Sequence, residues 1–238
     1  MALLDVRGVQ KRFGGVHAVR GVDMTVEAGT LLGLFGPNGA GKTTLFNLIA
    51  GTTPPDAGTI RLNGEEITAL PSFRRAQRGI ARTFQVVRPF RSLSVLDNVL
   101  ASVPSAAATS RNDADGARAI LASVGLEDRA NDPAGLLTLG MLKRLEVARA
   151  LALEPCLLLL DEPLAGLTAG ETADLLALIR SLKSRTSIIM VDHNVRQSLS
   201  FCDRAIVLDA GSVIAQGSPD EVRRDPHVIR AYLGEATA

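Results

Sequence analysis

The sequence predicts an α/β fold in which a parallel sheet is flanked by an antiparallel β layer. Short apolar runs followed by glycine-rich turns and helical patterns recur along the chain, as they do when strands and helices alternate around a parallel sheet. The dipeptide Asn63-Gly64 lies between alternating residues over 58–67, which indicates a hairpin and therefore antiparallel strands. The length of 238 residues suits one large domain, so a second domain is not required.

The first clear unit is a strand, a glycine-rich loop and a helix in direct succession. Strands are expected at Leu4–Val9 and Val22–Val26, ahead of the apolar strand Leu31–Phe35. This last strand runs into Gly36. Beyond the loop, a helix with one buried face is expected to stop before Gly51, because its apolar residues fall at i, i+3 and i+4, namely Leu45, Leu48 and Ile49.

The second half of the chain predicts a βαβ crossover and a helical C-terminal tail. Leu157–Leu160 and Ser187–Val191 are expected to be buried strands, and the helical face between them is formed by Leu175, Leu178, Ile179 and Leu182. Strands at Arg204–Leu208 and Val213–Gln216 flank a turn, and a capping box with an N1 proline at 218–221 predicts a helix start. Residues 101–119 are either a surface helix or a mobile connection.

Composition argues against several classes of protein. Lys and Arg number 26 against 25 Asp and Glu, so no electrostatic footprint for nucleic acid is expected. Cys156 and Cys202, the latter in an expected helix, lack Cys-x-x-Cys spacing and are interpreted as reduced thiols of a cytosolic protein. The apolar run near 156–160 is far shorter than the roughly 20 residues of a spanning helix. The N-terminal residues do not have the basic-then-apolar pattern of a leader. Membrane association is therefore expected to go through a partner.

Residues 36–43 match the phosphate-binding pattern G-x-x-x-x-G-K-[ST], which predicts a P-loop NTPase that uses ATP and Mg²⁺. Glycines let backbone N–H groups wrap phosphates, and the following helix N-terminus adds its dipole. Lys42 is expected to reach the β- and γ-phosphates and Thr43 the magnesium ion. The nucleotide-binding residues assigned here are Gly36, Pro37, Asn38, Gly39, Ala40, Gly41, Lys42, Thr43 and Thr44. The alternative is an ordinary glycine turn.

Asp161 and Glu162 directly follow the apolar run Leu157–Leu160. A carboxylate at the end of a buried strand can hold magnesium through its water shell, and we assign Asp161 to this role. Glu162 is assigned as the base that polarises the attacking water. The alternative is an acidic turn after a core strand.

His193 follows the strand that ends near Asp192, at the carboxyl edge where parallel sheets gather catalytic groups. We assign it as a catalytic residue that contacts the γ-phosphate. A structural histidine is the alternative, because His17 and His227 have no ligand-like spacing to it.

With these motifs in order, nearly the whole chain resembles the ATP-binding cassette (ABC) ATPases. The resemblance implies a RecA-like parallel core over 1–85 and 155–238, with a helical subdomain inserted at 86–154. It implies that Phe13, in Lys-Arg-Phe-Gly-Gly, stacks on adenine, and that Gln85, in Arg-Thr-Phe-Gln, is the Q-loop glutamine that senses magnesium and the γ-phosphate. Without the family, a core phenylalanine and an exposed amide are the alternatives.

Residues 137–141, Leu-Thr-Leu-Gly-Met, resemble the family signature L-S-G-G-Q. Thr138 keeps a hydroxyl and Gly140 an unobstructed N–H, so both are assigned to the γ-phosphate; Leu139 and Met141 replace the usual glycine and glutamine. Because family signatures face the P-loop of another subunit, a homodimer or heterodimer of cassettes is implied. Thr168 stands where the D-loop commonly has Asp.

Several stretches are similar to the ATPases of branched-chain amino-acid importers, the LivG-like branch: 11–15, 80–85, 143–146, 202–204 and 228–234. This similarity implies an ATP-hydrolysing subunit at the cytoplasmic face of the inner membrane. Its partners would be integral-membrane permeases, a second cassette and, for an importer, an extracytoplasmic solute-binding protein. Lipopolysaccharide-export ATPases share much of the ending and remain an alternative. A soluble ABC protein acting on ribosomes or DNA is a further one. A P-loop kinase would leave Gln85, His193 and residues 138–140 unexplained.

Six arginines crowd the segment 74–91: Arg74, Arg75, Arg78, Arg82, Arg88 and Arg91. A solvated surface is expected, and contact with anionic lipid or a permease is the alternative. The resemblance implies that Arg88-Pro89-Phe90 lies where family members receive a permease helix.

Overall fold

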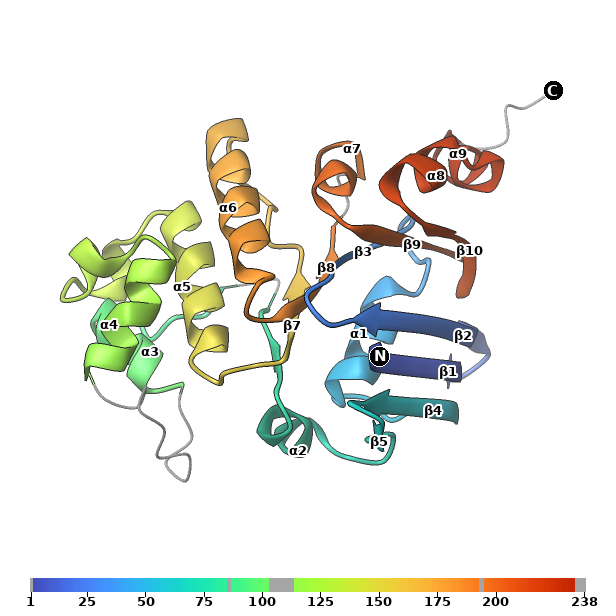
Figure 1. Ribbon diagram of the computed structural model, residues 1–238, viewed down its shortest axis with the longest axis horizontal. Helices are drawn as coiled ribbons and strands as arrows, with labels where there is room; N and C mark the ends of the chain where they lie inside the picture. Colours follow the sequence, from blue (N-terminus) through green and yellow to red (C-terminus); the bar gives the residue numbers. More distant parts are fainter. Residues whose placement is uncertain (1, 85–86, 103–113, 193–194, 234–238) are drawn as a thin grey trace.

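The computed structural model describes residues 2–84, 87–102, 114–192 and 195–233, and its centre is a six-stranded sheet (Figure 1). The strand order is β10-β9-β3-β8-β7-β6, and only β10 runs antiparallel to its neighbour. The strands are β3 (Leu31–Phe35), β6 (Ile80–Arg82), β7 (Leu157–Asp161), β8 (Ser187–Val191), β9 (Arg204–Asp209) and β10 (Ser212–Gly217). The predicted parallel core is therefore confirmed.

A four-stranded antiparallel sheet of order β2-β1-β4-β5 forms the predicted β layer. It contains β1 (Ala2–Phe13), β2 (Val16–Glu27), β4 (Ala57–Leu62) and β5 (Glu65–Glu66). Asn63 and Gly64 both have positive φ, 51° and 81°, which confirms the hairpin between β4 and β5. β1 and β2 are longer than predicted, because register shifts let pairing continue where the alternation of apolar and polar residues fails.

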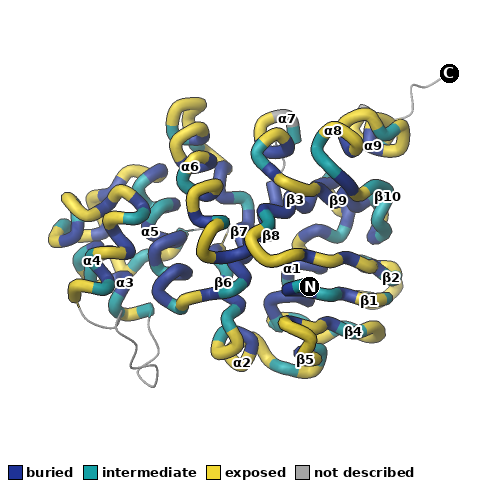
Figure 2. Tube along the Cα trace, in the orientation of Figure 1, coloured by how far each residue is buried: buried dark blue, intermediate teal, exposed yellow. Residues whose placement is uncertain are grey.

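The six-stranded sheet is covered on both faces. β3, β7 and β8 are buried along their whole length (Figure 2). On one face, Leu158 and Leu160 pack in a core with α5 (Leu139–Leu151) and α6 (Ala169–Leu182). On the other, Leu157 and Leu159 pack in a core with α1 (Lys42–Ala50) and the antiparallel sheet. Successive strand residues point to opposite faces, so one apolar run serves both cores.

The helix ends follow their local signals. α1 ends at Ala50, and Gly51 beyond it has φ 76°, the left-handed conformation that glycine accepts. α8 (Pro219–Arg224) has the predicted capping box between Ser218 and Glu221, and α9 (Pro226–Leu233) forms the tail. α6 contains the predicted helical face. The helix expected at Cys202 was wrong: a 3₁₀ turn, Leu199–Phe201, ends there because Cys202 is already extended ahead of β9.

A group of helices lies to one side of the sheet. α3 (Val95–Leu100), α4 (Ala114–Ser123) and α5 pack together there, whereas α2 (Ser72–Gln77) lies beside β6 and α7 (Val195–Ser198) follows β8 (Figure 1). Of the segment 101–119, residues 114–119 belong to α4, and 103–113 lie outside the described residues.

The expectation that the six arginines are solvated is wrong for Arg75, which is 1% exposed. Its guanidinium donates to the carbonyls of Leu48 and Ile49 at the end of α1, at 2.6 and 2.8 Å. It also donates to the carbonyls of Leu70 and Thr68, both at 2.9 Å. Burial lowers the pKa of Arg75 to about 10, so the group stays charged at neutral pH. Arg75 thus caps the helix that begins at the phosphate-binding loop.

Replacing Arg75 by Met is expected to destabilise the protein by about 2–4 kcal/mol, because several buried carbonyls lose their donor at once. The denaturant midpoint of unfolding measures this loss. Arg74→Met is the matched control, since Arg74 is exposed and its side chain donates only to Gln77 among the hydrogen bonds of the described residues. Equal midpoints for the two variants would contradict the capping role.

Candidate functional site

The loop between β3 and α1 has a backbone that only glycine accommodates at two positions. Gly36 has φ 146°, and a Cβ there would lie 2.2 Å from the carbonyl oxygen of Leu208. Gly41 has φ 99°, and a Cβ there would lie 2.3 Å from the carbonyl oxygen of Ala18. The loop is therefore pressed against neighbouring strands, and a side chain at either position would collide with their backbone.

Lys42, the first residue of α1, folds back over this loop and is 5% exposed. Its Nζ donates to the carbonyls of Gly36 and Pro37 at 2.7 and 2.8 Å. Burial lowers the pKa of Lys42, and the nearby Glu162 carboxylate opposes that effect. An ammonium group at the first turn of a helix is suited to binding an anion.

A cavity of about 560 Å³ opens over the loop. Glu162 lines it together with every loop residue from Asn38 to Thr44, so the structure brings these predicted residues together. Gly36 and Pro37 are not among the residues that line it. Four residues of β2 that the sequence interpretation did not assign also line it: Val16, His17, Ala18 and Arg20. These residues could have been found from the sequence, because they directly follow the Gly14-Gly15 turn. Val16, Ala18 and Arg20 alternate along the strand and so lie on one face.

Asp161 ends β7 and is 6% exposed. Its N–H donates to Oγ1 of Thr83 at 3.3 Å, and its Oδ2 lies 3.5 Å from Nη2 of Arg82. Arg82 also donates to Oδ1 of Asn47 at 2.9 Å. Arg82 is therefore a second exception to the expected arginine surface, whereas the remaining four are exposed: Arg74, Arg78, Arg88 and Arg91.

Glu162 has a positive φ of 47°, which is uncommon for a residue with a Cβ. Its N–H donates to the carbonyl of Val191 at 2.9 Å, and its own carbonyl accepts from Nζ of Lys143 at 3.1 Å. The backbone at Glu162 is thus held from both sides, by β8 and by α5. Such over-determined strain is found at functional sites.

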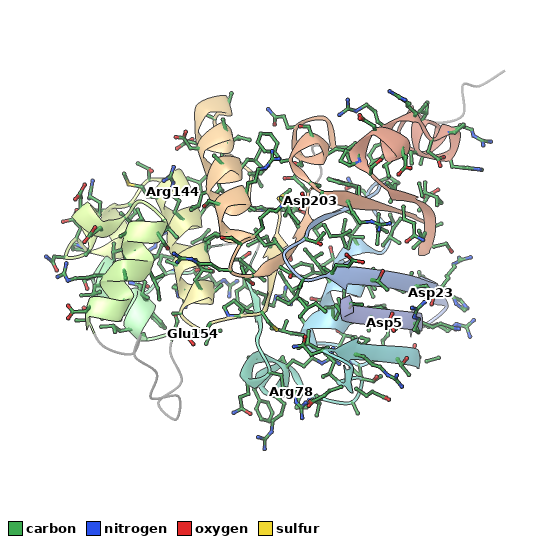
Figure 3. All side chains as sticks on the ribbon, viewed as in Figure 1. Asp5, Asp23, Arg78, Arg144, Glu154 and Asp203 are labelled. Atoms are coloured by element: carbon green, nitrogen blue, oxygen red, sulfur yellow. The ribbon has the colours of Figure 1, made fainter. Side chains whose placement is uncertain are left out.

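Thr138 and Gly140 lie in a different cavity, of about 280 Å³, at the start of α5. Thr138 caps the helix by accepting from the N–H of Met141 at 3.4 Å. The other residues that line this cavity are Gly125, Met141, Glu171 and Arg144, the last labelled in Figure 3. Among the described residues, the two cavities have no lining residue in common. Within a single chain, the signature and the phosphate-binding loop therefore line separate cavities.

Phe13, which the resemblance assigns to adenine, lies outside the 560 Å³ cavity. It is 52% exposed at the end of β1, with Nζ of Lys11 5.6 Å from its ring centroid. Gln85 and His193 lie outside the described residues. Within the part of the chain that the structure describes, no cluster of three or more His, Cys, Asp or Glu residues suits a metal ion. No helix in that part is long and apolar enough to cross a membrane.

The profile of the family described as "ABC transporter" matches residues 19–165. The chain belongs to this family. A second profile, "Branched-chain amino acid ATP-binding cassette transporter", matches residues 212–238 of the same chain. The ABC membership confirms the P-loop NTPase fold and makes the protein an ATP-binding, ATP-hydrolysing subunit of a transporter.

This ABC ATPase is similar to three curated relatives over almost its full length. The high-affinity branched-chain amino acid transport ATP-binding proteins BraF of Pseudomonas aeruginosa and LivG of Escherichia coli are 40% and 39% identical to it, and each comparison covers 98% of both chains. The lipopolysaccharide export system ATP-binding protein LptB of Escherichia coli is 39% identical, over 99% of this chain and 98% of LptB.

Two solved structures of ABC transporter cassettes have the same fold as this ABC ATPase. An ATP-binding cassette of an ABC transporter in its ADP conformation has a TM-score of 0.90 and 30% identity, over 99% of this chain and 100% of the other. A nucleotide-free cassette has a TM-score of 0.90 and 29% identity, with the same coverage.

Proposed function

We propose that this ABC ATPase hydrolyses magnesium ATP in the 560 Å³ cavity and drives amino-acid import through permease partners. The observation that carries the proposal is that Glu162 and the whole stretch Asn38–Thr44 line one cavity. A phosphate chain bound by the loop would thus lie beside a carboxylate able to accept a proton from water.

The residues of this cavity divide the chemistry between them. Lys42 and the loop N–H groups bind the β- and γ-phosphates and neutralise their charge. The hydroxyl of Thr43 and the carboxylate of Asp161 are hard oxygen donors of the kind that magnesium prefers, and Nη2 of Arg82 lies 3.5 Å from Oδ2 of Asp161. Bound there, magnesium would neutralise the charge that develops on the phosphates.

Glu162 takes the proton from water as the water oxygen bonds to the γ-phosphorus and the bond to the β-phosphate oxygen breaks. ADP and phosphate leave, and the proton passes from Glu162 to solvent. By resemblance, Gln85 acts at the magnesium and the γ-phosphate, His193 contacts the γ-phosphate and Phe13 stacks on adenine.

A second cassette completes the site in this proposal. Thr138 and Gly140 have the hydroxyl and N–H that would bind a γ-phosphate, and their cavity is separate from the loop of the same chain. Two cassettes facing each other would bring each signature to the other's loop. We propose the division into a core, 1–85 and 155–238, and a helical subdomain, 86–154, as the units that move on closure.

A mixed dimer tests this arrangement with Thr138→Trp and Lys42→Ala. Two mixed dimers are prepared from differently tagged copies. In the first, one copy carries both changes and the other is wild type; in the second, each copy carries one change. With composite sites, one change in each copy leaves one intact site, whereas both changes in one copy leave none, and the ATPase rates should differ accordingly. The opposite ranking would mean that each signature serves its own loop. Ser218→Ala, which also removes a helix cap, is the control for stability.

The proposed substrates are branched-chain or other amino acids. Support comes from the similarity to BraF and LivG and from the profile that matches residues 212–238. The proposed partners are two permeases and an extracytoplasmic binding protein, with this ABC ATPase peripheral at the cytoplasmic face of the membrane. The similarity to LptB keeps lipopolysaccharide export as the second candidate.

Copurification from detergent-solubilised membranes separates these candidates. Recovery of two hydrophobic permease chains, together with ATPase activity that rises when a leucine-loaded binding protein is added, is the expected result. Recovery with lipopolysaccharide-transport subunits would favour export. Recovery with ribosomes, and with no membrane chain, would overturn a transport role in this organism.

A further inference from the structure

Lys143 is a buried cation that the proposed chemistry does not use. It lies on α5, within the group of helices beside the sheet, and is 6% exposed. Its Nζ donates to the main-chain carbonyl of Glu162 at 3.1 Å. A helix outside the sheet thus reaches the turn that presents the proposed base.

That turn needs support from its surroundings. A non-glycine residue with φ near 47° is held in a conformation that L-residues visit rarely, and it persists only when neighbouring groups fix it. The N–H of Glu162 is bonded to Val191 on β8, at 2.9 Å. The carbonyl accepts from Nζ of Lys143 at 3.1 Å and from the N–H of Ala165 in its own turn at 3.3 Å, so Lys143 is the donor that links the turn to α5. The direction of the Glu162 side chain depends on this peptide geometry, because the Cα–Cβ bond turns with the backbone.

The charge environment explains how a lysine can stay there. Burial lowers the pKa of Lys143 and is the largest effect on it, while the carboxylates of Glu162, Glu146, Asp161 and Asp192 act in the opposite direction. Glu146 lies on α5 itself, Asp161 ends β7 and Glu162 follows it, and Asp192 comes directly after β8. These nearby carboxylates favour the charged ammonium and so oppose the effect of its burial.

We propose that Lys143 is a positioning residue for ATP hydrolysis, which holds the Glu162 turn so that the carboxylate faces the nucleotide cavity. This inference rests on the proposed role of Glu162. Lys143 touches neither water nor phosphate in the proposal and acts through the backbone of the base. Because α5 also begins at the signature, a shift of this helix would move Lys143 and with it the backbone of Glu162.

The test compares three variants of the full chain in steady-state ATPase assays. Lys143→Met removes the donor, and kcat is expected to fall between about tenfold and 100-fold, the loss typical of a misplaced catalytic group. The KM for ATP should stay within about twofold, since no phosphate contact is lost. Lys143→Gln is uncharged but keeps an N–H donor, so it should recover most of kcat. If the Met variant does not fold, Lys143→Thr, too short to reach the carbonyl, replaces it with the same expectation.

The matched control is Lys183→Met. Like Lys143, Lys183 donates a hydrogen bond through Nζ, in this case to the carboxylate of Asp203 at 2.6 Å. This bond lies at the opposite edge of the sheet from Glu162. Its removal should lower the melting temperature and leave kcat unchanged. If Lys143→Met shows the same behaviour, Lys143 is merely structural and the inference is overturned. A Gln variant as slow as the Met variant would also overturn it.

A double variant separates this inference from the function on which it rests. If Lys143 acts through Glu162, adding Lys143→Met to Glu162→Gln should slow turnover no further. Wild-type turnover of Glu162→Gln alone would refute the base itself. An inactive Glu162→Gln protein beside a fully active Lys143→Met protein would refute only the positioning role.

Discussion

Glu162→Gln is expected to bind ATP and to lose turnover by between about 100-fold and 10,000-fold, the contribution typical of a general base. Glutamine fills the same space in the cavity beside Lys42, but its amide cannot accept the proton of the attacking water. Phosphate release measures the loss, and light scattering with ATP present should report an accumulated dimer.

Glu154→Gln is the matched control for this variant. Glu154, labelled in Figure 3, also has a positive φ, 49°, but it is exposed and lies before β7, at the other end of the strand from Glu162. Loss of its charge should leave the rate unchanged. A Glu162→Gln protein that hydrolyses ATP at the wild-type rate would refute the assignment of the base.

Lys42→Ala is expected to lose ATP binding rather than turnover alone. Truncating one member of a buried, hydrogen-bonded charge pair costs about 2–5 kcal/mol, which is roughly 30-fold to 4,000-fold in the dissociation constant. Nζ of Lys42 donates to the carbonyls of Gly36 and Pro37, and these are its only partners among the hydrogen bonds of the described residues. Because Lys42 lines a cavity, water can take the place of the ammonium there, and the fold itself should lose little stability.

Thermal unfolding with and without ATP distinguishes these two effects. The wild-type protein should melt at a higher temperature when ATP is present, because the ligand binds only the folded state. Lys42→Ala should melt near the wild-type temperature without ATP and gain nothing from it. Lys183→Ala, a lysine remote from the cavity, should keep the ATP-dependent shift. An unchanged dissociation constant in Lys42→Ala would contradict the assignment.

The sequence by itself determined the features whose causes are local. The loop 36–43 needed only its own glycines and the strand and helix on either side, and the structure has these elements with the predicted ends at Phe35 and before Gly51. The hairpin at Asn63-Gly64 and the cap at Ser218 depend on a few consecutive residues in the same way. Family membership followed because such motifs occur here in a fixed order.

Only the tertiary structure decided where the charged side chains of the site go. Arg75, Arg82 and Lys143 look like surface residues in the sequence, yet the first caps α1, the second pairs with Asp161 and the third bonds to Glu162. Burying a charge is favourable only when donors and acceptors surround it. Those partners lie 27, 79 and 19 residues away along the chain, beyond the reach of any periodicity, and the packing of α1, β6 and α5 against the sheet brings them together.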